Sequence, residues 1–408
     1  MKSSTGRWVS GDSFFNRERE LQILETLVRD RNHVLLTGQR RMGKTSIVRE
    51  LGRILESNGW IFLFVDVEGV ESPEQAIGDI ARAAHRVRSI TSRFTTGMTR
   101  FLIDNFEEIT AFEFGVKIRA GLNEGNWRHH GEQIFRACAE QDEQVLLVID
   151  ELPIFLKRML KRDGNARRVD QFLSWLRGVL QILGDDAPVL VVSGSIGLEP
   201  LMRRLGIPDR INYFYSYRLG PWDRETCVNC FNRLARQYAL SVEDGVADAV
   251  YTALGIGIPH HVQSFFARLR DFAVMHGHDR VTVKDVKDVY RNSLLGPPGQ
   301  NDLVHYETRL KEGLEDESYS IAMEVLAEAA VQGVFTPDAG NCLARMYSRL
   351  ANDAITRIAD VLGVLQHDGY LVPGNDGYRF ESRMLKDWWA SRFRDHHIPI
   401  LRRDTYHE

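Results

Sequence analysis

The most informative segment of the sequence is His33-Val-Leu-Leu-Thr-Gly-Gln-Arg-Arg-Met-Gly-Lys-Thr-Ser-Ile-Val-Arg-Glu-Leu51. It opens with an apolar run, Val34–Leu36, that predicts a buried strand. The G-x-x-x-x-G-K-T signature follows directly, and beyond it Ile47 and Leu51 recur at the spacing of a helix face. This signature binds phosphate where it joins a strand to a helix. The segment therefore predicts a P-loop.

The residues of this loop suit a nucleoside triphosphate. Gly38 and Gly43 allow the backbone to curl so that successive N–H groups point at phosphate oxygens, and the helix beginning near Lys44 adds its N-terminal dipole. We expect Lys44 to reach the β- and γ-phosphates and the Thr45 hydroxyl to bind Mg²⁺. The residues expected to bind the nucleotide here are Gly38, Gln39, Arg40, Arg41, Met42, Gly43, Lys44, Thr45 and Ser46.

A second apolar run, Val145–Ile149, ends in Asp150-Glu151. A parallel strand would carry these carboxylates to the sheet edge beside the P-loop. We expect Asp150 to hold Mg²⁺ directly or through water, and Glu151 to orient and polarise the attacking water. A surface turn would also explain an Asp-Glu pair, but the preceding strand and the upstream P-loop favour the catalytic interpretation. The two motifs together predict an ATPase that uses ATP and Mg²⁺.

A further strand, beginning at Val189, ends in Ser193-Gly194-Ser195. The Ser195 hydroxyl at this position could bond the γ-phosphate or the attacking water, which makes Ser195 a candidate catalytic residue. A helix N-cap for the following segment is the alternative, and both interpretations stay open.

The chain has 408 residues, of which 43% are hydrophobic and 26% charged, as in a globular protein of two or three domains. No window approaches the ~20 apolar residues of a membrane-spanning helix, and the N-terminus lacks the apolar region of a secretory signal. We therefore expect a cytoplasmic protein. Its net charge of −4 argues against coating nucleic acid by bulk charge.

Cys227 and Cys230 form a C-x-x-C without a second pair, which favours incidental helix residues over zinc or redox chemistry.

The apolar runs predict an α/β fold of three layers. The expected strands are Val34–Leu36, Trp60–Val67, Val145–Ile149, Val189–Ser195 and Ile211–Leu219. From Trp222 the pattern becomes helical, and Gly296-Pro-Pro-Gly-Gln-Asn301 predicts a linker. Three helices near 318–331, 339–350 and 353–367, then a hairpin with Asn375-Asp376-Gly377 at its tip, follow the order of a winged helix. We expect an ATPase core at 1–220, a helical lid at 221–296 and a winged-helix domain at 297–408.

Four motifs in this order resemble the archaeal-type ATPase family, which lies between the AAA+ ATPases and the STAND signalling NTPases. They are Phe15-Asn-Arg-Glu-Arg-Glu-Leu21, Gly38-Gln-Arg-Arg-Met-Gly-Lys-Thr-Ser46, Val148-Ile-Asp-Glu-Leu152 and Ser193-Gly-Ser195. The similarity covers roughly residues 14–290, and members of the family commonly append a winged helix. The resemblance thus implies an AAA+/STAND-like P-loop core.

The resemblance also implies two site residues outside the motifs. Pro259, in the Gly-x-Pro element Gly257–Pro259, would lie against the nucleotide. Arg210 precedes the fifth strand, where related ATPases place an arginine that reaches the γ-phosphate of a neighbouring subunit; a solvated loop arginine is the alternative. The lid sensor arginine of AAA+ proteins has no assigned counterpart, because the Gly-x-Pro element continues with His260-His261.

The sequence leaves the partner open. Residues 301–408 hold 12 Lys and Arg against 18 Asp and Glu, which offers few contacts for DNA phosphates and favours protein contacts or covering of the nucleotide site. The basic stretches Arg86–Arg100 and Lys157–Arg168 are better candidates for a DNA or RNA surface, with solvated helix faces as the alternative.

We expect a Mg²⁺-dependent ATP-hydrolysing switch that forms homo-oligomers. Its nucleotide state would control oligomerisation and engagement of a protein or nucleic-acid partner. One alternative is an ATP-bound DNA-binding regulator with negligible turnover, which Glu151 disfavours because a pure binder does not need that carboxylate. Another is a scaffold for a separately encoded effector, as in antiviral defence systems or mobile elements.

Overall fold

The computed structural model describes residues 8–87, 89–90, 121–194, 197–348 and 353–403. The chain forms two compact units. The sheet unit comprises Arg17–Thr37 and Lys44–Leu219, and the helical unit comprises Met1–Asn16, Gly38–Gly43 and Gly220–Glu408. The division into three domains stays a prediction.

The sheet unit is built on a parallel sheet of five strands, as the apolar runs predict. The strands are β1 (Val34–Thr37), β2 (Ile61–Asp66), β3 (Val145–Asp150), β4 (Val189–Ser193) and β5 (Tyr215–Arg218). Their order is β2-β3-β4-β1-β5, and every pairing is parallel. All residues of β1, β3 and β4 are buried. Such continuous buried strands need cover on both faces of the sheet, and layers of helices provide it.

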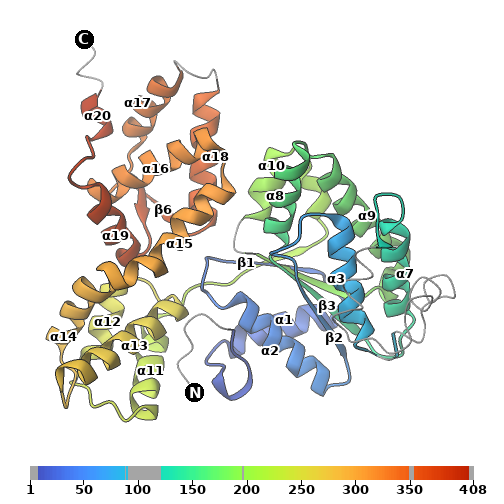
Figure 1. Cartoon of the computed structure of the whole chain (residues 1–408), viewed down its shortest axis with the longest axis horizontal. Coiled ribbons are helices and arrows are strands. Elements are labelled where there is room, and N and C mark those ends of the chain that lie inside the picture. The colour runs from blue at the N-terminus through green and yellow to red at the C-terminus, as the bar shows by residue number, and fades with distance from the viewer. Residues whose placement is uncertain (1–7, 88, 91–120, 195–196, 349–352, 404–408) are drawn as a thin grey trace. The chain divides into compact units, whose positions relative to one another are not determined.

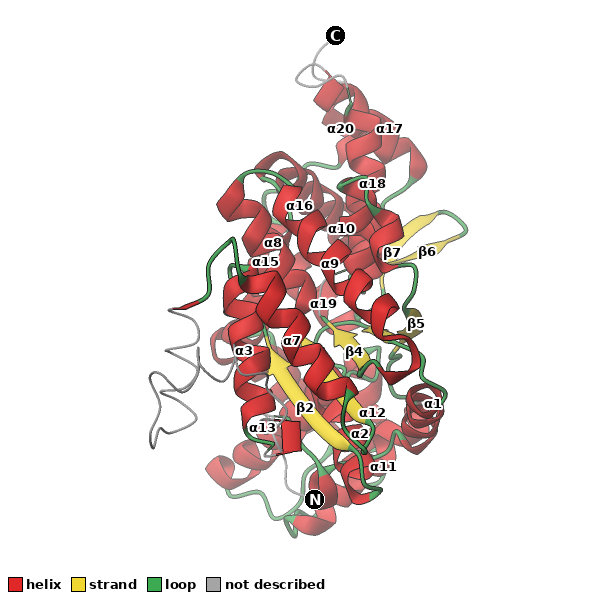
Figure 2. Ribbon diagram, turned by 90° about the vertical axis from the view of Figure 1, so that its right-hand side faces the viewer, coloured by secondary structure: helices red, strands yellow, loops and turns green. Residues whose placement is uncertain are grey.

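Helices cover both faces of this sheet. They are α1 (Glu18–Arg29), α2 (Lys44–Ser57), α3 (Pro73–His85), α7 (Trp127–Ala139), α8 (Leu152–Asp163), α9 (Arg167–Leu183) and α10 (Leu198–Arg204). Figure 1 shows α1 and α2 on one face of the sheet and α3 and α7 to α10 on the other. Figure 2 shows β2 and β4 as arrows that point the same way, as helical crossovers between parallel strands require. The three-layer α/β prediction is confirmed.

The fifth strand is shorter than the sequence suggests. Its predicted range, Ile211–Leu219, contains only the four residues of β5, because a 3₁₀ turn at Pro208–Ile211 precedes it. Pairing with β1 begins where the Tyr215 N–H donates to the His33 carbonyl at 2.7 Å. As an edge strand, β5 keeps much of its side-chain surface exposed.

The helical unit consists mainly of helices that follow one another along the chain. Its helices are α11 (Arg224–Gln237), α12 (Val246–Leu254), α13 (Pro259–His276), α14 (Val283–Val289), α15 (Pro297–Gly313), α16 (Asp316–Val331), α17 (Pro337–Ser348), α18 (Ala354–His367), α19 (Arg383–Phe393) and α20 (Ile400–Arg403). One apolar core runs through them from Trp222 to Ile400. The described part of the chain contains no helix that is both long and apolar enough to cross a bilayer.

The linker predicted at Gly296–Asn301 is wrong. These residues form the start of α15, with Gly296 as its N-cap and proline in its first turn. Proline is tolerated there because the first N–H groups of a helix have no partner within the helix. The Pro-Pro pair therefore marks the start of a helix.

A hairpin follows α18 in the expected position. Strands β6 (Leu371–Gly374) and β7 (Gly377–Phe380) pair antiparallel around Asn375-Asp376, and Figure 2 draws them as paired arrows. Gly377 has a φ of 138°, and a Cβ there would lie 2.2 Å from the Phe335 carbonyl oxygen. The order of three helices and a hairpin is thus present, while its function as a winged helix stays a prediction.

Candidate nucleotide site

The P-loop lies between the end of β1 and the start of α2. Gly43 has a φ of 91°, a conformation that glycine adopts without strain. Arg41 also has a positive φ of 67°. The helix begins at Lys44, whose side chain is only 6% exposed. A loop that ends in a helix N-terminus is the local structure in which backbone N–H groups bind phosphate.

Two hydroxyl groups converge on Asp150. Thr45 Oγ1, in the first turn of α2, donates to Asp150 Oδ2 at 2.6 Å. Ser193, the last residue of β4, donates its hydroxyl to Asp150 Oδ1. A threonine hydroxyl beside a carboxylate is an all-oxygen donor set of the kind that Mg²⁺ prefers, so these residues fit the metal that the motifs imply. The structure brings the two expected metal ligands, Thr45 and Asp150, together.

Glu151 lies at a strained point of the backbone. Its φ of 60° is left-handed, and its N–H donates to the carboxylate of the preceding Asp150 at 3.1 Å. The turn it makes starts α8, where the Glu151 carbonyl accepts from the Ile154 N–H at 3.1 Å. Left-handed non-glycine residues often occur at functional sites, where the surrounding structure maintains the strain.

Ser193 is a site residue that the sequence reasoning missed. It is fully buried on the Asp150 carboxylate, whereas Ser195 lies outside the described residues and keeps its predicted role as a prediction. Gly194 explains the close packing here, because a Cβ on it would lie 2.3 Å from Pro153 Cδ in α8. The available signal was the position of Ser193 at the end of a predicted strand, where a side chain can reach the carboxylate that ends a neighbouring strand.

The loop residues between Gly38 and Gly43 make their described contacts inside the helical unit. Gln39 is 3% exposed, and its Nε2 donates to the Gly369 carbonyl at 2.7 Å. Arg41 contacts the His260 ring, one residue after Pro259. Pro259 itself occupies the first turn of α13.

Arg210 sits in the 3₁₀ turn before β5. Its Nε lies 2.6 Å from Asp170 and its Nη1 lies 2.6 Å from Asp209. These carboxylates raise the pKa of Arg210, with the Asp170 hydrogen bond as the largest cause. An arginine finger at this position would have to leave both carboxylates, and the predicted role stays a prediction.

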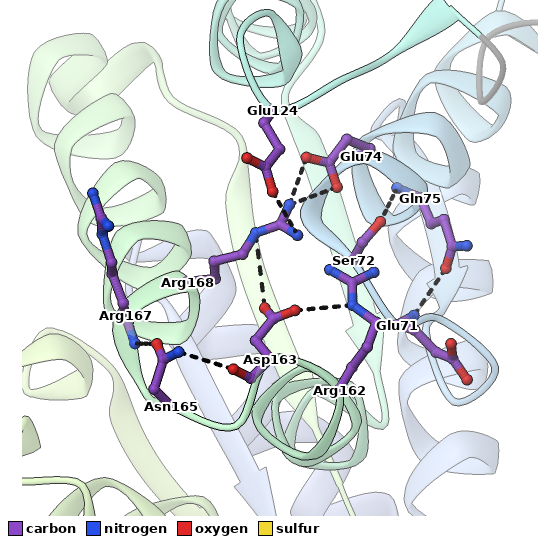
Figure 3. Close-up of polar contacts among 10 residues, drawn as sticks. All are labelled: Glu71, Ser72, Glu74, Gln75, Glu124, Arg162, Asp163, Asn165, Arg167 and Arg168. Atoms are coloured by element: carbon purple, nitrogen blue, oxygen red, sulfur yellow. Dashed lines mark hydrogen bonds and ion pairs between the residues drawn. The ribbon is translucent and has the colours of Figure 1, made fainter.

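Three arginines of the basic stretch Lys157–Arg168 are paired with carboxylates of the chain: Arg158, Arg162 and Arg168. Figure 3 shows Arg168 between Glu74, Glu124 and Asp163, with bidentate hydrogen bonds of 2.6 and 2.8 Å to Glu74. Arg162 lies 3.0 Å from Asp163 as well. These pairs weaken the stretch as a nucleic-acid surface, because each would have to exchange its carboxylate for a phosphate. Most of the other basic stretch, Arg86–Arg100, lies outside the described residues.

The cysteines support no redox or zinc site. Cys227 and Cys230 are buried on α11, and burial raises the pKa of Cys230 to about 12. A buried, protonated thiol is a poor metal ligand and a poor nucleophile. Among the described residues, no group of three or more His, Cys, Asp or Glu side chains could hold a metal ion.

Solved structures share this fold. A Walker-type ATPase of Pyrococcus abyssi matches with a TM-score of 0.63 and 17% identity, over 94% of this chain and 97% of that chain. The ORC2 protein of Aeropyrum pernix, solved in ADPNP–ADP complexes, matches with a TM-score of 0.56 and 14% identity, over 97% of this chain and 98% of that one. No family model matches the sequence, and neither does any curated protein.

The parallel sheet and the strand–loop–helix arrangement at residues 34–57 define a P-loop nucleotide-binding fold. More particularly, the chain has the fold of the AAA+ type of P-loop ATPases, the fold that its resemblance to the archaeal-type ATPases implies.

Proposed function

We propose that this chain binds and hydrolyses ATP with Mg²⁺ and that its nucleotide state controls oligomerisation and engagement of a partner. The observation that carries the proposal is the contact of Thr45 with Asp150, 2.6 Å apart at the end of a P-loop. These residues are 105 positions apart in sequence, and a nucleotide-bound Mg²⁺ gives a reason for their meeting. The adenine nucleotides bound to the ORC2 protein support ATP as the nucleotide.

Different side chains would bind the phosphates, bind the metal and activate the water. Lys44 and the loop N–H groups bind the phosphates, and Mg²⁺ on Thr45 and Asp150 would neutralise the charge that develops in the transition state. Ser193 holds Asp150 in place from β4. Glu151 orients a water and accepts its proton as the water oxygen attacks the γ-phosphorus; the bond to the bridging oxygen breaks, which yields ADP and phosphate.

A phosphate-release assay tests this function. Purified protein should release phosphate from ATP with Mg²⁺ and stop when EDTA removes the metal. Light scattering in the apo, ADP-bound and non-hydrolysable ATP-bound states should then show a change of mass with nucleotide. A chain that neither binds ATP nor changes mass would contradict the proposal.

The partner is proposed to be a protein, with nucleic acid as the alternative. Helix α18 would be the recognition helix of a winged helix, but it exposes a large hydrophobic side chain, Ile355, which is 76% exposed. Its one arginine, Arg357, already lies 2.5 Å from Glu317 and 2.8 Å from Asp353. A surface of this kind has few free cations to bind DNA phosphates.

A switch of this kind would act in the cytoplasm, where its four buried cysteines stay reduced.

A duplex DNA sample in the same light-scattering series separates the two partner classes. The proposed switch should not shift in mass with DNA at physiological salt. A nucleotide-dependent shift with DNA, without turnover, would favour the alternative of a DNA-binding regulator.

A further inference from the structure

Helix α2 follows strand β2 closely along one face of the sheet. Gly52 lies against Phe62, whose ring would be 2.4 Å from a Cβ on that glycine. One turn earlier, the Arg49 guanidinium stacks over Phe64 at 3.7 Å from the ring centroid. Four residues before Arg49, Thr45 bonds Asp150. The helix therefore places a fixed positive charge near the end of β2, next to the candidate metal site.

Asp66 is the residue at that end. It is the last residue of β2 and pairs in register with Asp150, the last residue of β3. Side chains of residues paired in register on neighbouring strands leave the sheet on the same face. Asp66 thus stands beside Asp150, at the same level of the sheet and toward α2.

The two carboxylates share one cationic neighbour on α2. The Arg49 guanidinium interacts electrostatically with both Asp66 and Asp150. Two carboxylates at the same level of neighbouring strands form an all-oxygen group of the kind that binds a divalent ion and its waters.

We propose that Asp66 is a third protein group of the metal site, with its carboxylate holding a water of the Mg²⁺ that Thr45 and Asp150 bind. Mg²⁺ usually keeps several waters in protein sites, so an outer carboxylate has a water to hold. Arg49 then serves as a positioning residue that keeps the two carboxylates adjacent. This inference rests on the proposed nucleotide function.

A purely structural role for Asp66 is the rival explanation. Its Oδ1 accepts from the Glu68 N–H at 2.9 Å, which closes a turn after β2. Asparagine can make the same bond but carries no charge. Asp66→Asn therefore removes the proposed role and retains the structural one, while Asp66→Ala removes both.

Binding of a fluorescent ADP analogue at increasing Mg²⁺ concentrations tests the proposal without using turnover. Outer groups of metal sites typically contribute 10-fold or more to metal affinity. Asp66→Asn should raise the Mg²⁺ midpoint about 10-fold and leave binding in EDTA unchanged. Glu143→Gln is the matched control, because Glu143 is exposed and lies just before the amino end of β3, whereas Asp66 lies at the carboxyl end of β2. This control variant should behave as wild type. Mn²⁺ titration followed by EPR should rank the variants in the same order.

The outcomes distinguish a failure of the Asp66 proposal from a failure of the proposed nucleotide function. Wild-type Mg²⁺ dependence in Asp66→Asn, with a defect only in Asp66→Ala, would assign Asp66 to the turn alone and overturn the inference. Failure of the wild type to bind the ADP analogue under any condition would instead overturn the proposed function. Arg49→Gln should raise the Mg²⁺ midpoint as well, and Arg49→Lys should restore part of the loss; equal midpoints in both would remove Arg49 from the proposal.

Discussion

At the scale of single residues, Lys44 carries the most direct prediction. It is nearly fully buried at the start of α2, next to the loop that would hold the phosphates. Lys44→Ala removes its ammonium group, so ATP affinity should fall at least ~10-fold, or about 1.4 kcal/mol. Arg53→Ala is the control, because Arg53 is a cation on the same helix that is exposed and paired with Glu50. Calorimetric titration with ATP would measure both, and equal affinity in wild type and Lys44→Ala would refute the P-loop assignment.

Glu151 allows binding and turnover to be separated. Glu151→Gln keeps the size of the side chain but removes the base, so ATP should still bind while hydrolysis falls by a factor of about 10²–10⁴. Phosphate release under single-turnover conditions would measure the loss. Glutamine enters the left-handed conformation at this position at a cost similar to that of glutamate, so the thermal stability of the variant serves as the control. Wild-type hydrolysis would show that another group activates the water.

At the scale of elements, the contact of α2 with β2 has a measurable stability. Gly52→Ala would push a methyl group into the Phe62 ring, and overpacking of this kind typically costs about 1–3 kcal/mol. Gly178→Ala is the matched control on α9, because the added Cβ would have no atom within 4 Å apart from its chain neighbours and the backbone of its own helix. That change should instead stabilise the protein by about 0.5–1 kcal/mol, since alanine is the better helix former. Thermal unfolding followed by circular dichroism should move in opposite directions for the two variants.

His33, the residue before β1, predicts that the stability of the fold depends on pH. His33 Nδ1 accepts a hydrogen bond from the Leu190 N–H at 3.1 Å, which a protonated ring cannot do. Burial, with a smaller effect of Arg31, lowers the pKa of His33 to about 4. Between pH 6.5 and pH 4, His33 therefore binds a proton in the unfolded chain but stays neutral in the folded chain. The free energy of unfolding should fall as the pH drops through this window, by up to about 3 kcal/mol.

Chemical denaturation at several pH values measures this effect. His33→Gln can retain an acceptor for the Leu190 N–H but cannot titrate, so its stability should vary less across the window. An unchanged pH profile in that variant would assign the acid sensitivity to other groups.

The elements also show what the sequence could reveal about the site. The strands, the P-loop and Asp150-Glu151 were predictable because buried parallel strands and glycine-rich loops have strong local signatures. Ser193 was not, because a serine that ends a strand looks the same whether it caps a helix or bonds a carboxylate 43 residues away. The start of α15 was misread for a related reason: proline and glycine occur both at helix starts and in linkers.

At the scale of the whole molecule, Arg210 provides the test of assembly. If a neighbouring subunit supplies this arginine to the ATP site, specific activity should rise with protein concentration, and Arg210→Ala should abolish the rise while ATP affinity stays nearly intact. Separation of Arg210 from Asp170 and Asp209 is part of the cost of assembly. Asp170→Asn weakens one of these pairs and should lower the concentration needed for activity.

Mixing variants makes the same test sharper. Arg210→Ala and Lys44→Ala are each expected to be inactive alone, but mixed interfaces pair an intact P-loop with an intact Arg210, so activity should partly return. A mixture that assembles and stays inactive, or full activity of Arg210→Ala alone, would identify Arg210 as an ordinary surface arginine and the chain as a monomeric switch.

The strand order has a consequence for how the protein is made. Strand β1, which leads into the P-loop, pairs with β4 and β5, and the pairing ends at Arg218, about 180 residues after Thr37. At a synthesis rate of about 5–20 residues per second, β1 waits roughly 10–40 s on the ribosome before both neighbours exist. Its apolar edges are exposed throughout that time. Strand β1, which is encoded early, is therefore among the last strands of the sheet unit to gain both of its neighbours, and nascent chains of this protein are natural clients for chaperones.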